Sequence, residues 1–282
     1  MGAKLPVTVR SSSMELEYII ADPTGNITLL ITTPVPERER ARYAGHLMEH
    51  EPAAEQAGFL RLTEAGVSLD MAGGEFCGNA SLSAAAAYAW EKGLRPGERL
   101  AVSVRVSGTP KPVTAVIEAL GGGSFYGTVD MPPPVSARTQ SFTLDGREYF
   151  LPLVSFEGIS HVIAPGDLPG ERAEAAARRW CAELDAPALG LMLLDEAQMR
   201  LRPLVYVPGA DTMFWESSCA SGTTAVGAWL SLRDGAPRSL NLKAPGGVLS
   251  IEADFAGGVF RLGGHVRLGQ RKRAEGVEIQ RK

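Results

Sequence analysis

Two cysteines in this chain stand in settings suited to proton transfer. Cys77 is followed by Gly-Asn-Ala-Ser and Cys219 by Ala-Ser-Gly-Thr, and in both places the small residues lead directly into an apolar, helix-like run. Gly93 lies 16 positions after Cys77, and Gly235 lies 16 positions after Cys219. A thiol at a helix N-terminus faces unpaired N–H groups and the positive end of the helix dipole. We therefore expect both thiols to have a pKa below the free value of about 8.5.

Two such helix ends facing each other would suit inversion of an amino acid. The N–H groups would hold the carboxylate from both sides and so place Cα between the two sulfurs. One thiolate would remove the Cα proton and the opposite thiol would supply another, without pyridoxal phosphate or a metal. Because an amino-acid Cα–H is a weak acid, the two helix dipoles would have to stabilise an enolate-like intermediate. The pattern predicts a two-base racemase or epimerase.

The segments that position the cysteines occur twice along the chain. Each half opens with β-rich runs around a turn, continues through a charged helical stretch with Pro near its start, and reaches further strand-like runs before its cysteine. Each cysteine helix is apolar on all sides, which indicates that it is buried, and three more strand-like runs follow it. The expected elements are 17–21, 27–32, 36–48, 58–62, 67–71, 82–90, 100–106, 112–117 and 124–130 in the first half, and 149–155, 162–164, 169–183, 190–194, 198–206, 224–232, 239–242, 248–252 and 258–262 in the second.

The repeat predicts an α/β (α+β) fold of two pseudo-symmetric domains, each a curved mixed β-sheet wrapped around a central helix. The N-terminal domain would cover residues 1–135, with the C-terminal tail 266–282 returning to it, and the C-terminal domain would cover 141–265. The triple proline at 132–134 and the polar segment 136–141 are interpreted as the linker between them.

The composition excludes several other classes of protein. The chain has 282 residues, of which 45% are hydrophobic and 21% charged, as in a soluble globular enzyme. A net charge of −4 gives no broad basic surface, so we expect no nucleic-acid partner. The sequence has no export signal at its start and no window of about 18 apolar residues, so we expect a cytoplasmic protein without a membrane partner. Three cysteines and four histidines form neither a disulfide framework nor a metal pattern, and no cofactor is expected.

Both cysteine segments resemble signatures of the diaminopimelate epimerase superfamily. Residues 74–80, Gly-Glu-Phe-Cys-Gly-Asn-Ala, are similar to its Cys-Gly-Asn box, and residues 216–223, Glu-Ser-Ser-Cys-Ala-Ser-Gly-Thr, are similar to its second cysteine box. Shorter matches at Gly25-Asn26 and at 158–161 extend the resemblance along nearly the whole chain. The resemblance implies a cofactor-independent racemase or epimerase that acts on a small amino acid, uses Cys77 and Cys219 as catalytic residues, and forms a homodimer.

The candidate substrate-binding residues lie at or beside these matches. Asn79 follows Cys77 by two positions, and Ser221 follows Cys219 by two. At such a place one side chain can both cap the helix and contact the substrate. Glu216 is either a charge near the helix start or a group that tunes the thiols and binds the substrate ammonium. The full set is Asn26, Gly78, Asn79, His161, Glu216, Ala220 and Ser221, and no metal ligand is predicted.

Other reactive side chains have plainer interpretations. Cys181 has no glycine or polar cradle, so we expect it in the core or on a helix surface. Glu49, Glu51 and Glu55 form an acidic stretch that is typical of a solvated face, although it could also supply a partner for a cationic side chain.

Departures from the superfamily pattern bear on the substrate. Diaminopimelate epimerases hold the second amino-acid group of their substrate with asparagines and a Glu-Arg pair. This chain has Ile-Ser at 159–160 in place of Asn-Pro, and Val-Pro at 207–208 in place of Glu-Arg. Missing hydrogen bonds of this kind disfavour diaminopimelate. The two cysteine segments are most similar to the histidine racemases of staphylopine-type metallophore biosynthesis, which makes histidine the expected substrate.

Two alternatives remain beside histidine racemisation. The first is diaminopimelate epimerase itself, converting the LL to the meso isomer. The second, from another class, is a non-catalytic two-lobed protein that binds small molecules, which would not need matched thiols. Proline racemases share the implied fold but carry His where this chain has Asn79, and phenazine-biosynthesis isomerases lack the paired cysteines.

Overall fold

The computed structural model describes residues 14–64 and 66–277. The start of the chain, where no export signal is expected, and residues 278–282 of the expected tail lie outside this part. The described residues form a mixed α/β fold dominated by one 16-stranded sheet. None of its helices is both long and apolar enough to cross a membrane.

The first half of the chain contributes seven strands and two α-helices. They are β1 (Met14–Pro23), β2 (Thr28–Ile31), α1 (Glu37–His50), β3 (Gln56–Thr63), β4 (Gly66–Met71), α2 (Gly78–Glu91), β5 (Arg99–Val106), β6 (Val113–Gly121) and β7 (Ser124–Asp130).

The second half contributes the remaining strands and helices. They are β8 (Ser136–Leu144), β9 (Arg147–Phe156), β10 (Ile159–Pro165), α3 (Gly170–Glu183), β11 (Leu189–Asp195), β12 (Arg200–Val207), a short 3₁₀ turn η1 (Pro208–Ala210), β13 (Thr212–Trp215), α4 (Ala220–Asp234), β14 (Arg238–Ala244), β15 (Gly247–Asp254) and β16 (Val259–Val277).

The order of strand pairings repeats in the two halves. β1 and β2 form an antiparallel hairpin, β2 pairs parallel with β3 after α1, and β4 pairs parallel with β5 after α2. In the same order, β9 and β10 are antiparallel, β10 pairs parallel with β11 after α3, and β12 pairs parallel with β14 after α4. Both cysteine helices are therefore crossover helices between parallel strands, because parallel neighbours need a long connection.

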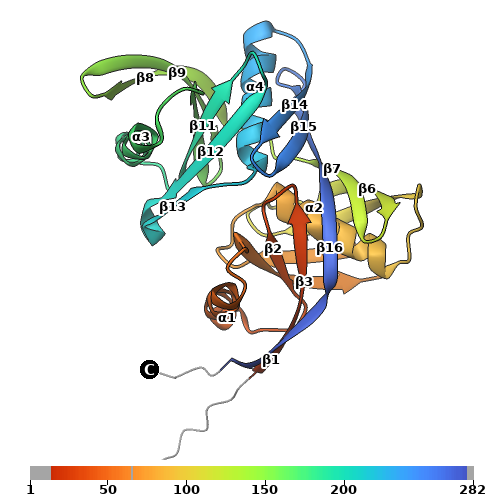
Figure 1. The fold of residues 1–282 in the computed structure, drawn as a ribbon. Helices are drawn as coiled ribbons and strands as arrows, with labels where there is room; N and C mark the ends of the chain where they lie inside the picture. The colour runs from red at the N-terminus through yellow and green to blue at the C-terminus, as the bar shows by residue number, and fades with distance from the viewer. Residues whose placement is uncertain (1–13, 65, 278–282) are drawn as a thin grey trace, which may run out of the picture.

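A closed ring of eight strands surrounds α2. Strands β1 to β7 pair in order, β7 pairs with β16, and β16 returns to pair with β1. α2 contacts all eight of these strands, and nearly all of its residues from Gly78 to Ala89 are buried. An apolar helix enclosed in this way explains why its alanine-rich sequence shows no polar face. In Figure 1, β16 runs from the upper group of elements down beside β1.

The rest of the sheet curves around α4. It continues from β16 through β15, β14, β12, β11, β10 and β9 to β8, and α4 contacts β8 to β11 and β14 to β16. Each central helix is followed by a glycine with positive φ, Gly93 at +69° and Gly235 at +64°. Glycine adopts this conformation without strain, which accounts for the equal cysteine-to-glycine spacing.

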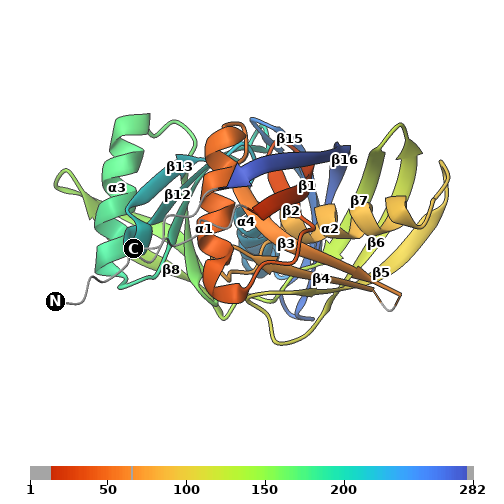
Figure 2. The ribbon, with the colours of Figure 1, turned by 90° about the horizontal axis from the view of Figure 1, so that it is seen from below.

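The other two helices cover the outer face of the strands, as Figure 2 shows for α1 and α3. Leu30 of β2 points to the core around α2, whereas its neighbours Leu29 and Ile31 pack in a separate cluster with Leu47 of α1. Strands with a helix on each face are apolar on both faces. The apolar runs read from the sequence in β2 and β11 follow from this burial.

One expectation about the connection between the halves is wrong. The polar segment 136–141, interpreted as a linker, belongs to β8 and pairs antiparallel with β9 along its full length. The strand is fixed by its later residues Phe142 and Leu144, which are buried against Trp180 and its neighbours. β13 was also not expected, and the last strand extends far past residue 262 to pair with β1.

Candidate active site

Cys77 and Cys219 occupy the same position, the N-cap of a central helix. Both have extended backbone angles, and each sulfur accepts a hydrogen bond from the N–H three residues on, at 3.4 Å from Ala80 N and 3.4 Å from Gly222 N. The sulfur thus takes the place of the side-chain oxygen in an ordinary N-cap. This hydrogen bond holds each thiol at the positive end of its helix.

The two helix N-termini meet. The first residue of α2, Gly78, lies against the first residue of α4, Ala220, and against Met131. At the fourth position of each helix, the backbone N–H donates to the carbonyl of the capping cysteine. These bonds run from Ser81 and from Thr223, at 2.9 Å each. Within the described residues, this leaves the N–H groups at the first two helical positions of both helices without an acceptor, which is the arrangement that binds a carboxylate.

A buried amide network lies beside Cys77. Asn79 donates to the side-chain oxygen of Asn26 at 3.1 Å and to Ser218 Oγ at 3.3 Å, so it joins the first β-hairpin to the segment before Cys219. Gln56 donates to the same Asn26 oxygen at 2.7 Å, and its side chain also faces the Cys77 thiol. Asn79 is 1% exposed, and its own Oδ1 has no hydrogen-bond partner among the residues that the structure describes.

A second buried group lies beside Cys219. Ser221 Oγ is 3.6 Å from Cys219 Sγ and 3.0 Å from His161 Nε2. His161 is fully buried, and a side chain at Gly190 would collide with its ring. Burial lowers the pKa of His161 to about 3, so the ring is neutral at neutral pH. His161 therefore positions Ser221 rather than carrying charge.

Glu216 is the acidic group of the site. Its side chain is half-buried and faces the Cys219 thiol, and its charge also acts on Cys77. Burial, and secondarily the charge of Glu55, raise the pKa of Glu216 to about 7. A carboxyl group with such a pKa exchanges a proton readily near neutral pH, as a general acid or base requires.

The expectation of lowered thiol pKa values is wrong. Burial, followed by the charges of Glu75 and Glu216, raises the pKa of Cys77 to about 11, despite the hydrogen bond from Ala80. Burial and the adjacent Glu216 raise the pKa of Cys219 well above its usual range. The expectation took only the helix ends into account. Burial of the sulfurs and a nearby carboxylate both disfavour the thiolate, and together they outweigh the helix dipole.

All the residues proposed from the sequence for the site lie in these groups around the two helix ends. Two further residues of the amide network were missed, Gln56 and Ser218, whereas Glu55 was noted only as part of an acidic stretch that could partner a cationic side chain. No local motif marks Gln56, which joins the site through the pairing of β3 with β2, while Ser218 lies directly before Cys219 in the matched segment. Cys181 lies buried on α3, as expected, with its thiol donating to the carbonyl of Ala186 at 3.3 Å.

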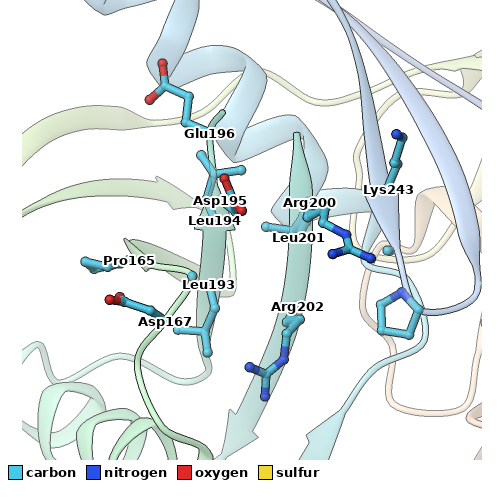
Figure 3. A pocket seen from close by; sticks show the side chains of 13 residues that line it. Pro165, Asp167, Leu193, Leu194, Asp195, Glu196, Arg200, Leu201, Arg202 and Lys243 are labelled. Carbon is cyan, nitrogen blue, oxygen red and sulfur yellow. The ribbon is translucent and has the colours of Figure 1, made fainter. Parts of the chain in front are cut away.

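A cavity of about 750 Å³ lies elsewhere, between β12 and β14. These two strands pair only at Arg200 and Lys243. Figure 3 shows acidic side chains on one side of it and Arg200, Arg202 and Lys243 on the other. Neither cysteine lines this cavity, so it is separate from the site described above. Within the described part of the chain, no group of three acidic, His or Cys side chains is arranged to hold a metal ion.

Comparison with known proteins identifies close relatives of this sequence. A family model described as the N-terminal domain of the histidine racemase CntK matches residues 15–268. A histidine racemase from Fusobacterium nucleatum subsp. nucleatum is 33% identical over 223 residues, covering 76% of this chain and 81% of that protein. A histidine racemase from Staphylococcus aureus is 27% identical over 246 residues, covering 84% and 88%.

Solved structures share the fold at lower identity. A hydroxyproline epimerase from Agrobacterium vitis with bound trans-4-hydroxy-L-proline has a TM-score of 0.66 at 13% identity, covering 93% of this chain and 92% of that one. A predicted epimerase from Pseudomonas aeruginosa has a TM-score of 0.64 at 17% identity, covering 94% and 100%. At such identities the likeness concerns the fold alone, which is the mixed α/β fold of proline racemases and related isomerases.

Proposed function

The chain belongs to the histidine racemase family and is an amino-acid racemase, and from this premise we propose that it interconverts L- and D-histidine with Cys77 and Cys219 as the two bases. The observation that carries the proposal is the matched placement of the two sulfurs. Both cap a central helix, and the first residues of the two helices touch. Two thiols that served only as small core residues would not require this symmetry.

The substrate carboxylate would bind the free N–H groups at the two helix ends. Gly78 and Asn79 supply them from α2, and Ala220 and Ser221 supply them from α4. Both helix dipoles then point at the carboxylate, which gains negative charge as the Cα proton leaves. The absence of a Cβ at Gly78 permits the close approach of the two helices.

Proton transfer needs one thiolate and one thiol, while burial and nearby acidic groups raise the pKa values of both thiols. The substrate ammonium would add a positive charge beside the sulfurs and so lower their pKa values. Glu216, which faces Cys219 and has a pKa of about 7, is the group placed to accept the thiol proton once the thiol pKa has fallen toward its own. One sulfur would then take the Cα proton as the opposite thiol gives up its own, and configuration inverts.

The proposal extends to the architecture and setting of the enzyme. Repeated strand pairings around α2 and α4 support two pseudo-symmetric domains of the diaminopimelate epimerase type, with boundaries near 135 and 141 and the tail returning to the first. We also propose a cytoplasmic homodimer that needs neither metal nor pyridoxal phosphate, and that binds neither nucleic acid nor membranes. Gel filtration with light scattering, and dialysis against chelator, test these points.

The experiment that tests the function is chiral chromatography of purified protein incubated with L-histidine and, separately, with LL-diaminopimelate. We expect D-histidine to accumulate to equality with the L form, and meso-diaminopimelate to form at least about 100-fold more slowly, because the site lacks a clamp for a second amino-acid group. Faster conversion of diaminopimelate would reassign the enzyme. Tight amino-acid binding without Cα deuterium uptake from D₂O would indicate a binding protein instead.

A further inference from the structure

Glu55 joins the two halves of the molecule across the candidate site. It precedes β3, and one carboxylate oxygen accepts from Asn26 Nδ2 at 2.6 Å in the first hairpin. The other accepts from the backbone N–H of Ser217 at 3.3 Å, in the segment that leads to Cys219. The carboxylate is exposed at the edge of the site rather than buried in the core.

Neither Glu55 nor Glu216 has an ion-pair partner within residues 14–64 and 66–277. A neighbouring acid of the same stretch does have one, since Glu51 pairs with Lys272 at 2.8 Å. The charge of Glu55 acts on Glu216, and the N–H groups that donate to Glu55 are uncharged, so neither carboxylate is neutralised by a cation of these residues. Such an arrangement favours a ligand that brings positive charge or N–H donors.

The orientation of the amide network points to the same kind of ligand. Because a carboxylate only accepts, the bond to Glu55 fixes which end of the Asn26 amide is nitrogen. The Asn26 oxygen then accepts from Asn79 Nδ2, which fixes the Asn79 amide in turn. Within residues 14–64 and 66–277, Asn79 Oδ1 is left as an unpartnered acceptor on a side chain that is 1% exposed and lies between Asn26 and Ser218. A buried acceptor without a partner indicates a donor that arrives with the substrate.

The two carboxylates lie at different depths. Glu216 is half-buried three residues before Cys219, whereas Glu55 is exposed at the edge and accepts from the N–H of the next residue, Ser217. A substrate whose Cα lies between the sulfurs would therefore meet Glu216 and Asn79 with its ammonium and Glu55 with its side chain. An imidazole ring carries an N–H donor in both of its protonation states.

We propose that Glu55 is the specificity-determining residue that receives the nitrogen-bearing side chain of the substrate, and that the chain therefore selects amino acids with an N–H donor or a cation at that place. This inference rests on the proposed function. It also gives Glu55 two roles, because the same carboxylate ties the Asn26 hairpin to Ser217. A test must separate recognition of the side chain from this structural tie.

The test compares L-histidine with β-(2-thienyl)-L-alanine, whose ring is of similar size but has no N–H. Binding of each is measured by calorimetry, and racemisation of histidine by chiral chromatography, for the wild type and Glu55→Gln. Glu49→Gln is the matched control, since it removes the same charge from the same acidic stretch at a residue outside the site.

For Glu55→Gln we expect histidine affinity to fall about tenfold or more, with thienylalanine affinity changed by less than about twofold. Glu49→Gln should change neither. Equal weakening of both ligands, or no weakening of histidine, would overturn the inference and leave Glu55 as a structural tie. Selective loss of histidine affinity in Glu55→Gln, with a wild type that binds histidine but does not racemise it, would instead overturn the proposed function while the inference stands.

Discussion

The first residue of α2 and the first residue of α4 are in van der Waals contact: a Cβ built on Gly78 would stand 3.0 Å from the Cβ of Ala220. It would also stand 2.7 Å from the sulfur of Met131. The Met131 side chain can move aside, but Ala220 is fixed by its helix. The absence of a side chain at residue 78 therefore sets the distance between the two helix ends, and with it the separation of the thiols that cap them.

Gly78→Ala should consequently separate the helix ends. We expect a loss of stability of about 1–3 kcal/mol from overpacking, together with at least a tenfold fall in kcat/KM for histidine, since both sulfurs must reach one Cα. Gly45→Ala in α1 is the control, because nothing lies within 4 Å of its added Cβ. Denaturant unfolding and racemisation rates measure the two effects. Wild-type activity in Gly78→Ala would contradict the requirement for close helix ends.

Glu216 should set the pH dependence of the reaction. Its pKa of about 7 predicts that kcat/KM rises as the pH rises through 7 and the carboxylate forms. In Glu216→Gln this rise should shift to the higher pH at which a thiol loses its proton without the help of a carboxylate. At pH 7.5, kcat/KM should therefore fall about 100-fold. Glu75→Gln, which removes an exposed charge near Cys77, should keep the rise near 7. An unchanged pH profile in Glu216→Gln would exclude it as the group that accepts the thiol proton.

The same carboxyl group should make the fold less stable at alkaline pH. Its pKa in the folded protein is raised above the ordinary value of 4.5, so its protonated form is favoured by folding. That contribution is fully present below pH 4.5 and is lost as the pH rises through 7. The Tm of Glu216→Gln relative to wild type should therefore increase between pH 5 and pH 8. A difference in Tm that stays constant or decreases over this range would contradict the raised pKa.

Ser221 should matter more for catalysis than for folding. Its hydroxyl lies between Cys219 Sγ and His161 Nε2, so Ser221→Ala removes contacts to both. We expect kcat to fall about tenfold for a stability loss of about 1 kcal/mol. Ser231→Ala removes a similar pair of hydrogen bonds at the far end of α4 and should leave kcat unchanged. Equal effects of the two variants on kcat would make Ser221 a purely structural residue.

Much of the site could be predicted because its key residues are local in sequence. The small residues after Cys77 and Cys219, the apolar runs and the final glycines each report on one helix, and both helices repeat. The repeat also predicts the parallel crossovers, since the same elements recur in the same order.

The remaining features depend on contacts between distant segments. Glu55 and Gln56 belong to the site only because β3 pairs with β2 beside Asn26. The segment 136–141 is polar, and its strand is fixed by partners in β9 and by the burial of Phe142. The raised thiol pKa values arise from Glu216, which the sequence already offers as a group that tunes the thiols, and above all from burial, which no local pattern measures.

Deuterium exchange by single cysteine variants tests the two-base mechanism most directly. L- and D-histidine are incubated separately in D₂O with Cys77→Ser and Cys219→Ser, and Cα deuterium is measured by mass spectrometry, with Cys181→Ser as the control for loss of a buried thiol. Serine still donates a proton but is a poor base, so each variant should lose racemisation and exchange one enantiomer only. The exchanging enantiomer should differ between Cys77→Ser and Cys219→Ser. Near wild-type racemisation in either variant, or exchange of the same enantiomer in both, would contradict the assignment of the two cysteines as the catalytic pair.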